Sequence, residues 1–531
     1  MESLKGMSTT MMEIAMKNEI SIGNSRGKVE SRKNAIQTEI SLEEGVSQWT
    51  NVSNVSGSRL RRSRQFEDSE QSEISPSSKS VFRKERKRTL SLSKNKRGIQ
   101  QKRFGTDEKK KINWIILIAT TFLIIFYFCR RSSKIAAEDE ESVKIIPNLS
   151  FEDILELPFE RRSKNAPTCN EILDSPYQMS PGDIQFTLVT QLSHDRLWML
   201  NHHCQRWGSK LKHPISVAIF TKLSVNEIRN QIEASMDHCD INFMAIQIIS
   251  SENIARSNYP VNALRNLAIS GVKTSHIFYA DIDFFEAPSI YDILHSASSR
   301  EQFAKDNKFA AVIPALAYKR ACDDEYDCLE QNLKLMPKTS KEVFEKLLKV
   351  DVFPFDPFNR GGHGSTSLWA WCDQENGTFF NIPCFKSNRY EPYLAFRYCD
   401  FFPPFQEKFT GYGKNKMTQV MHMRHVGYNF AQLGGAFLIH YPHKDSGSRL
   451  EWDKTPLELQ FDRNANTMRK ARDEGRFNDI NFTSYKRGQI DQLFVQFRSW
   501  LQNEVEDNSR VSLCENSMDD DAKLWVLNPK I

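Results

Sequence analysis

Two carboxylates stand two residues apart in the sequence YADIDF, residues 279–284. In an extended segment, Asp281 and Asp283 would point to the same side. Such a pair favours a hard divalent cation, and a diphosphate can supply further oxygen ligands. A solvated acidic turn is the alternative. The position after an apolar segment favours the cation site, because open α/β sheets bind ligands at the carboxyl ends of their strands.

A second group of possible metal ligands lies in FLIHYPH, residues 437–443. His440 ends an apolar segment, where its imidazole can reach the same cation. A histidine at this position is also compatible with a purely structural role. His443 is the substitute ligand. Mixed oxygen and imidazole donors favour Mn²⁺ over Mg²⁺.

The segments around these motifs alternate between strand and helix patterns, which predicts an α/β domain around a mostly parallel sheet. We expect Ser224 to cap one of the helices. The predicted strands are 184–192, 215–220, 241–249, 276–280 and 310–316, and the predicted helices include 195–207, 261–269 and 455–505.

The composition excludes several classes of protein. The chain has 531 residues, of which 39% are hydrophobic and 11% aromatic, too many for a disordered or collagen-like chain. The net charge of +5 hides an asymmetry: residues 1–111 carry +10 and the remainder carries −5. The basic character therefore says nothing about the partner of the folded part. A basic run at 83–88 favours contact with anionic lipid, or a trafficking signal, over nucleic-acid binding.

Residues 112–129 contain no charged side chain over 18 positions and predict a transmembrane helix of about 27 Å. Eight basic residues precede this segment within 94–111. The positive-inside rule therefore predicts a type II anchor with a cytoplasmic N-terminus. The sequons at Asn148, Asn376 and Asn481 fit a lumenal location for the rest of the chain.

Nine of the ten cysteines also follow the predicted span, which fits an oxidising compartment. The odd number leaves one thiol without an intramolecular partner. Cys322 and Cys328 are close enough for a local loop, as are Cys372 and Cys384, although the connectivity stays open. The predicted organisation is a disordered tail, a span, a stem, an α/β domain and a polar C-terminal tail, at 1–111, 112–129, 130–182, 183–505 and 506–531.

Several ordered blocks resemble glycosyltransferase family 49, whose members include a β-1,4-glucuronyltransferase and the second catalytic domain of the LARGE xylosyl/glucuronyltransferases. The resemblance covers about 183–445. Its blocks are TLVTQLS with DRL from 187, YPVN with LRN from 259, DIDF from 281, GH with a later Thr and Trp from 362, EPY from 391, GYG with NK from 411, and AFLIH with PH from 436.

The resemblance implies a GT-A-like fold, a UDP-sugar donor, Mn²⁺ and an inverting transfer to a sugar acceptor in the Golgi. It makes Asp281, Asp283 and His440 the metal ligands. The residues expected to bind the donor are Thr190, Gln191, Asp195, Arg196, Asn262, Arg265 and Asn266. A purely structural role, in a helix cap or an ion pair, is the alternative to donor binding.

Inversion in one step requires a general base on the acceptor hydroxyl. Glu391 is the candidate because it is the carboxylate of a family block, and a hydrogen bond to the acceptor is its alternative role. Asp373 and Asp400 are the other candidates. The residues expected to bind the acceptor are His363, Trp371, Tyr393, Asn415 and Lys416.

The sequence departs from the family pattern at three positions on the expected acceptor side. Lys414 replaces a tryptophan, Ala317 replaces a glutamate, and Arg389 replaces an acidic residue. Lys414 suits an acidic acceptor or is a solvated surface charge. The residues expected to bind the metal all match the family pattern. Because the departures lie on the acceptor side, they put the identity of the acceptor and of the linkage in doubt.

The sequence therefore predicts a Golgi enzyme that transfers glucuronic acid from its UDP-sugar to a glycan or glycoprotein acceptor. Transfer of N-acetylglucosamine or xylose, and a non-catalytic lectin-like role, are the alternatives. No nucleic-acid partner is expected. A homodimer or a complex with another Golgi enzyme is compatible with the sequence.

Overall fold

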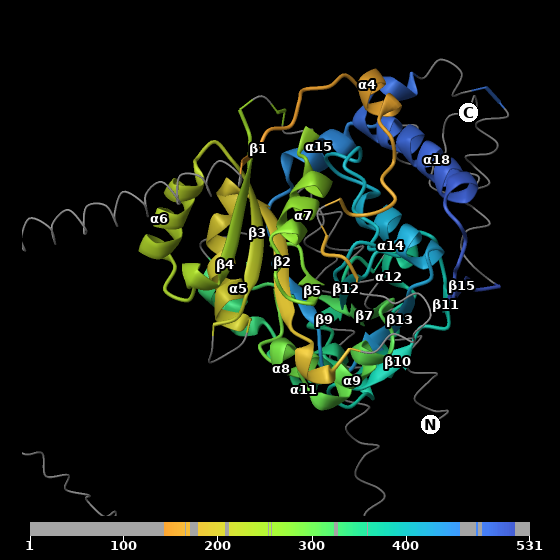
Figure 1. The fold of residues 1–531 in the computed structure, drawn as a ribbon. Helices are drawn as coiled ribbons and strands as arrows, with labels where there is room; N and C mark the ends of the chain where they lie inside the picture. Colours follow the sequence, from red (N-terminus) through yellow and green to blue (C-terminus); the bar gives the residue numbers. More distant parts are fainter. Residues whose placement is uncertain are drawn as a thin grey trace, which may run out of the picture. The chain divides into compact units, whose positions relative to one another are not determined.

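The computed structural model describes residues 143–515, except 165, 170–178, 208–211, 253, 256–257, 323–327, 358, 457–473 and 476–480 (Figure 1). The predicted cytoplasmic tail and the predicted span at 112–129 lie outside these residues. Within the described part of the chain, the helices are too short or too polar to cross a membrane.

A nine-stranded sheet forms the centre of the fold, in the order β1-β4-β3-β2-β5-β12-β7-β13-β10. Neighbouring strands from β1 to β5 pair in parallel, as the alternating pattern predicts. Strand β12 then enters antiparallel to both of its neighbours, so the whole sheet is mixed. In chain order the strands are β1 Val143–Lys144, β2 Phe186–Ser193, β3 Ile215–Thr221, β4 Met244–Ser250, β5 His276–Tyr279, β7 Phe309–Ile313, β10 Phe379–Asn381, β12 Tyr393–Arg397 and β13 Asn429–Leu433.

The helices between the parallel strands begin and end close to the predicted positions. Ser224 caps α6, Val225–Ser235, through a capping box with Glu227. Helix α7, Val261–Ser270, buries most of its side chains and contacts β2 and β3. The predicted helix at 195–207 consists of a 3₁₀ helix, His194–Met199, followed by α5, Leu200–Arg206.

A smaller sheet, in the order β6-β14-β8-β9, brings the predicted metal ligands together. Its strands are β6 Phe284–Glu286, β8 Ala315–Tyr318, β9 Val352–Pro354 and β14 Leu438–His440. The register of β6 and β14 pairs Phe284 with His440, directly after Asp283. The predicted strand at 310–316 is split between the two sheets, as β7 and β8.

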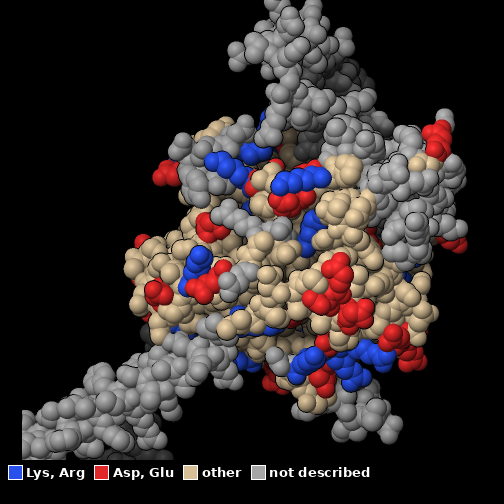
Figure 2. All heavy atoms as spheres, turned by 90° about the horizontal axis from the view of Figure 1, so that it is seen from above, with Lys and Arg blue, Asp and Glu red and all other residues tan. Residues whose placement is uncertain are grey.

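The remaining helices surround the two sheets (Figure 1). They are α4 Phe151–Glu156, α8 Ile290–Leu294, α9 Ala297–Lys305, α10 Leu329–Leu335, α11 Ser340–Leu348, α12 Arg360–His363, α13 Leu368–Cys372, α14 Asn415–His425, α15 Gly447–Asp453 and α18 Lys486–Glu504. Basic and acidic side chains are interspersed on the face seen in Figure 2, rather than gathered into one basic patch.

Parts of the predicted stem and tail belong to the folded unit. Strand β1 extends the large sheet, and α4 packs with Phe159 against an apolar cluster formed by α14 and α18. After α18, β15, Ser512–Leu513, pairs with β11, Cys384–Phe385. The prediction of a loose tail from residue 506 is therefore wrong for 506–515, because backbone pairing holds this segment.

Among the described residues four disulfides form: Cys169–Cys399, Cys204–Cys239, Cys322–Cys328 and Cys384–Cys514. Cys372 is the free cysteine of the described residues, as the odd number requires. The local loop at 322–328 is confirmed. A loop between Cys372 and Cys384 does not form, because Cys384 pairs with the C-terminal segment.

Replacing both Cys384 and Cys514 by serine should lower the free energy of unfolding by about 2–5 kcal/mol. The segment after α18 then loses its covalent link and keeps its non-covalent contacts, among them the short β11–β15 pairing and the Arg510–Asp306 ion pair. Chemical denaturation of the full chain measures the change. Cys372→Ser is the control, because this thiol forms no disulfide. Equal stability of the two variants would show that the disulfide does not stabilise the fold.

Candidate active site

Asp281 follows the end of β5 and accepts bonds from four side chains. Arg265 Nη2 lies 2.9 Å from its Oδ1, and Lys416 Nζ lies 3.1 Å from its Oδ2. Tyr393 donates its hydroxyl to Oδ2 at 2.9 Å, and Tyr279 donates to Oδ1. Both carboxylate oxygens therefore have two donors, supplied by α7, α14 and two strands.

The two cations fix the charge of this carboxylate. Burial by itself would raise the pKa of Asp281, but Lys416 and Arg265 override burial and hold the pKa far below its usual range. Burial also raises the pKa of the Tyr279 and Tyr393 hydroxyls, which stay protonated and able to donate. Asp281 is thus ionised and fully paired by protein groups.

Asp283 lies in a different environment, facing two histidines and one arginine. Its Oδ2 is 2.7 Å from His443 Nε2, 3.2 Å from Arg196 Nη1 and 3.9 Å from His440 Nε2. One donor atom each from Asp283, His440 and His443 lies within 4.8 Å of the others. The backbone holds this arrangement as well, because Tyr441 donates its N–H to the Asp283 carbonyl at 2.7 Å.

The chemistry of this second group suits a transition metal. Burial lowers the pKa of His440 to about 4, so its imidazole is neutral at pH 7. Burial would also lower the pKa of His443, but the Asp283 carboxylate raises it above its ordinary value. One carboxylate oxygen and two imidazole nitrogens form a donor set that fits Mn²⁺. His443, the predicted substitute, thus joins Asp283 and His440, whereas Asp281 is paired with cations.

The surroundings of the two carboxylates are electropositive. Arg196, Arg265 and Lys416 supply three positive charges against the two negative charges of Asp281 and Asp283. The net charge of this set is +1 before any metal binds. Such a lining attracts an anion, and a diphosphate is the class of ligand that open α/β sheets bind at this edge.

The predicted donor-side residues divide into two groups. Arg196 contacts Asp283 and His443, and Arg265 contacts Asp281. Thr190 lies near the end of β2 with a buried Oγ1 that has no protein hydrogen-bond partner. Gln191 accepts a hydrogen bond from Tyr259. These positions surround the carboxyl ends of β2 and β5.

The other donor-side residues point elsewhere. Asn262 is fully buried and donates to the Gln406 carbonyl, while Asn266 donates to the Phe405 carbonyl. Both asparagines therefore hold the 405–406 segment against α7. This is a structural role, the alternative to donor binding. Asp195 is exposed in the 3₁₀ helix.

Among the predicted acceptor residues, Tyr393 and Lys416 contact Asp281 directly. Burial lowers the pKa of His363 to about 3, and its neutral ring lies against Phe355, which also contacts His440. Asn415 donates to the Gly411 carbonyl and holds the preceding loop.

Trp371 does not fit the predicted role in acceptor binding. Its side chain is 1% exposed, its indole N–H donates to the Leu433 carbonyl, and its ring packs against Phe437. A side chain that is almost completely buried cannot stack on a sugar. The aromatic residue in this block belongs to the hydrophobic core.

Of the three predicted bases, Glu391 precedes Tyr393 by two residues, and the Tyr393 hydroxyl contacts Asp281. Burial raises its pKa, the charge of Asp356 raises it further, and Lys416 lowers it. Asp400 instead accepts the Cys169 N–H beyond the far end of β12, and Asp373 is exposed after α13. Asp373 and Asp400 thus lie in other parts of the fold than Glu391.

Asp356 was missed by sequence reasoning. It lies in a loop with a φ of 46°, and its charge acts on both Glu391 and Tyr412. A left-handed backbone at a residue other than glycine is uncommon, although aspartate tolerates it well. No spacing rule connects this loop with the Glu391 block, so only the fold brings them together.

The structure shows where two of the departures from the family pattern lie. Lys414 forms a buried ion pair with Asp491 of α18, so it is neither a solvated charge nor directed at an acceptor. Strand β8 runs parallel to β14 with Leu316 opposite Ile439, which places Ala317 next to His440.

Comparisons with known proteins agree with this geometry. Residues 239–472 match the family described as "Glycosyl-transferase for dystroglycan". The resemblance to glycosyltransferase family 49 is confirmed. The chain is 30% identical to the xylosyl- and glucuronyltransferase LARGE2 of Mus musculus over 275 residues, covering 51% of this chain and 36% of that protein. It is 28% identical to LARGE1 of Homo sapiens over 273 residues, covering 51% and 33%.

The chain thus spans about a third of the length of these curated relatives. Two solved structures are also similar: GalNAc-T7 with UDP, GalNAc and Mn²⁺, at a TM-score of 0.31, and TarS 1–349 of S. aureus with UDP-GlcNAc, at 0.28. Each is 11% identical and covers 61% of this chain, with 57% and 74% of the other chain covered. These TM-scores are too low to support a further statement.

Asp281→Asn should lower the free energy of unfolding by about 3–5 kcal/mol, because it leaves Arg265 and Lys416 without a buried counter-charge. Urea denaturation of the full chain measures the loss. Asp373→Asn is the matched control, since it removes an exposed carboxylate and should change stability by less than about 0.5 kcal/mol. The electrostatic account of Asp281 is wrong if the two variants are equally stable.

Proposed function

We propose that the chain is a metal-dependent, inverting glycosyltransferase that transfers glucuronic acid from UDP-glucuronate to a glycan acceptor. The observation that carries the proposal is the group formed by Asp283, His440 and His443 next to a positively charged lining. The names of the LARGE relatives, which include glucuronyltransferase, support the choice of sugar. A GT-A-like domain is the fold that the family resemblance implies.

Asp283, His440 and His443 would hold Mn²⁺, which when bound acts as a Lewis acid and stabilises charge on the leaving diphosphate. Arg196 contacts both Asp283 and His443 and is placed to pair with a phosphate oxygen. Arg265 and Lys416 keep Asp281 ionised and fixed. The site is thus organised for charge stabilisation before the substrate arrives.

Glu391 is the group we assign to proton transfer. The acceptor hydroxyl gives its proton to the Glu391 carboxylate as its oxygen bonds to the anomeric carbon of the donor. The bond from that carbon to the diphosphate oxygen breaks, and its electron pair leaves with UDP. A pKa raised by burial suits a base that works near neutral pH.

We further infer that the enzyme acts in the Golgi lumen as a type II membrane protein. The apolar segment at 112–129 and the basic residues before it support this topology. The three sequon asparagines, Asn148, Asn376 and Asn481, are all exposed, as oligosaccharide transfer requires. Four disulfides fit an oxidising compartment.

The direct test is hydrolysis of a panel of UDP-sugars, with a xylose-terminated acceptor added in parallel, in Mn²⁺ and in EDTA. We expect Mn²⁺-dependent turnover of UDP-glucuronate, lost in Asp283→Asn and His440→Ala. Preference for UDP-xylose or UDP-N-acetylglucosamine would reassign the donor. No turnover of any donor, with UDP still bound in calorimetry, would favour the lectin-like alternative.

Glu391→Gln should lower the rate by about 100-fold or more, the typical contribution of a general base. Because the raised pKa belongs to a group that must be ionised, the wild-type rate should fall as the pH drops through that pKa. The variant should lose this acid limb. Asp373→Asn is the control and should keep the wild-type profile. An unchanged acid limb in Glu391→Gln would exclude Glu391 as the base.

A further inference from the structure

Asp283 occupies the third position of a tight turn. Phe284 donates its N–H to the Asp281 carbonyl at 2.9 Å, which closes a β-turn with Ile282 and Asp283 in the centre. Among the described residues, the non-glycine positions with positive φ are Val350, Asp356 and Lys414. Asp283 therefore has a negative φ, as in a type I turn and unlike a type II turn.

The sequence by itself leaves the alternative turn accessible. A type II turn needs a positive φ at its third residue, and aspartate tolerates that conformation better than most residues. Converting one type into the other rotates the central Ile282–Asp283 peptide and turns its carbonyl over. The Asp283 side chain would then leave its present direction toward His440 and His443.

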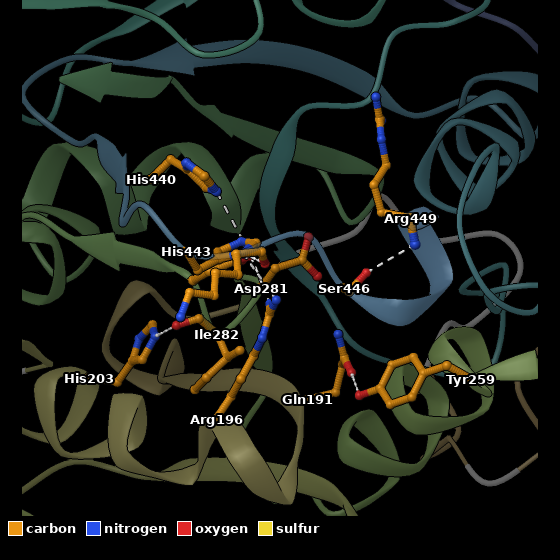
Figure 3. A network of polar contacts seen from close by, with 12 residues as sticks. Gln191, Arg196, His203, Tyr259, Asp281, Ile282, His440, His443, Ser446 and Arg449 are labelled. Carbon is orange, nitrogen blue, oxygen red and sulfur yellow. Dashed lines mark hydrogen bonds and ion pairs between the residues drawn. The ribbon is translucent and has the colours of Figure 1, made fainter. Parts of the chain in front are cut away.

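The side chain of a buried histidine, His203, contacts the carbonyl of this peptide (Figure 3). His203 Nε2 lies 2.9 Å from the Ile282 carbonyl oxygen, and His203 Nδ1 lies 2.7 Å from Glu286 Oε2. Both side chains are fully buried. Because a carbonyl only accepts, Nε2 donates to Ile282, and Nδ1 faces the Glu286 carboxylate as an ion pair. The charge of the ring then balances the charge of Glu286.

Both His203 and Glu286 are themselves held in place by further contacts. Helix α5, which carries His203, is tied by the Cys204–Cys239 disulfide, and its Arg206 donates to the Glu286 carbonyl at 3.2 Å. Glu286 lies on β6, opposite Leu438 of β14. Burial would lower the pKa of His203, but Glu286 raises it, in agreement with a protonated ring. The contact between His203 and Glu286 thus joins helix α5 to the small sheet.

We propose that His203, held by Glu286, is a positioning residue that locks the Ile282–Asp283 peptide and so aims the Asp283 carboxylate at His440 and His443. The proposal rests on the proposed function, because it takes these three residues as the metal site. A purely structural buried pair is the competing explanation, and it predicts loss of stability without a specific effect on the turn.

His203→Ala and His276→Ala form a matched pair for the test. Each removes a fully buried imidazole, and His276 lies at the opposite end of β5 with its Nδ1 next to Ser275. Two properties of the full chain are measured: hydrogen exchange of the 280–284 segment without metal, and Mn²⁺ binding in the presence of UDP by calorimetry.

We expect His203→Ala to accelerate exchange in 280–284 and to weaken Mn²⁺ binding by about tenfold or more, the usual effect of losing such support. His276→Ala should do neither. Glu286→Gln, which can still accept from Nδ1, should stay within about threefold of wild type and serves as the conservative variant. If His203→Ala fails to fold, His203→Gln, which preserves volume and one donor, is measured in its place.

Equal exchange in His203→Ala and His276→Ala would overturn the positioning role. This outcome is independent of the metal. Absence of Mn²⁺ binding by the wild-type chain would instead contradict the proposed function, and the exchange comparison alone would then decide whether His203 locks the turn.

Discussion

The site depends on one partly buried carboxylate, 16% exposed, being neutralised by protein cations. Asp281 receives charge from Arg265 and Lys416 and hydrogen bonds from two tyrosines, so helices α7 and α14 and strands β5 and β12 meet at a single side chain. A buried carboxylate without these partners would be strongly destabilising. The requirement to surround Asp281 therefore determines how these four elements pack around the end of β5.

With Asp281 satisfied in this way, the second carboxylate is available for other chemistry. Asp283 lies only two residues further on, but the pairing of β6 with β14 directs it toward His440 and His443. Two acidic residues in one motif thus have different roles: one organises the protein around itself, and the other faces the proposed metal. Their environments, rather than their spacing, separate these roles.

Local patterns predicted the parallel half of the fold well. Apolar strands and a capping serine are encoded within short segments, so β2, β3, β5 and α6 follow from the sequence. The antiparallel entry of β12 and the splitting of 310–316 between two sheets depend on long-range pairing, which no local pattern contains. The anchoring of 506–515 likewise depends on a partner 130 residues away, in the Cys384–Cys514 disulfide.

The candidate site shows the same division. The DID motif, His440 and Glu391 were found because they follow apolar segments or lie in family blocks. Trp371 was assigned wrongly, because membership of a block does not distinguish a core aromatic residue from a sugar-binding one. Lys414 and Asp356 have roles that depend on Asp491 and Glu391, which lie far from them in the sequence.

The most direct test of the central claim is a crystal structure with UDP and Mn²⁺, in which anomalous scattering locates the metal. The account predicts one metal within coordination distance of Asp283, His440 and His443, with Asp281 still paired to Arg265 and Lys416. A metal bound by Asp281 after displacement of those cations, or located away from both histidines, would contradict the account.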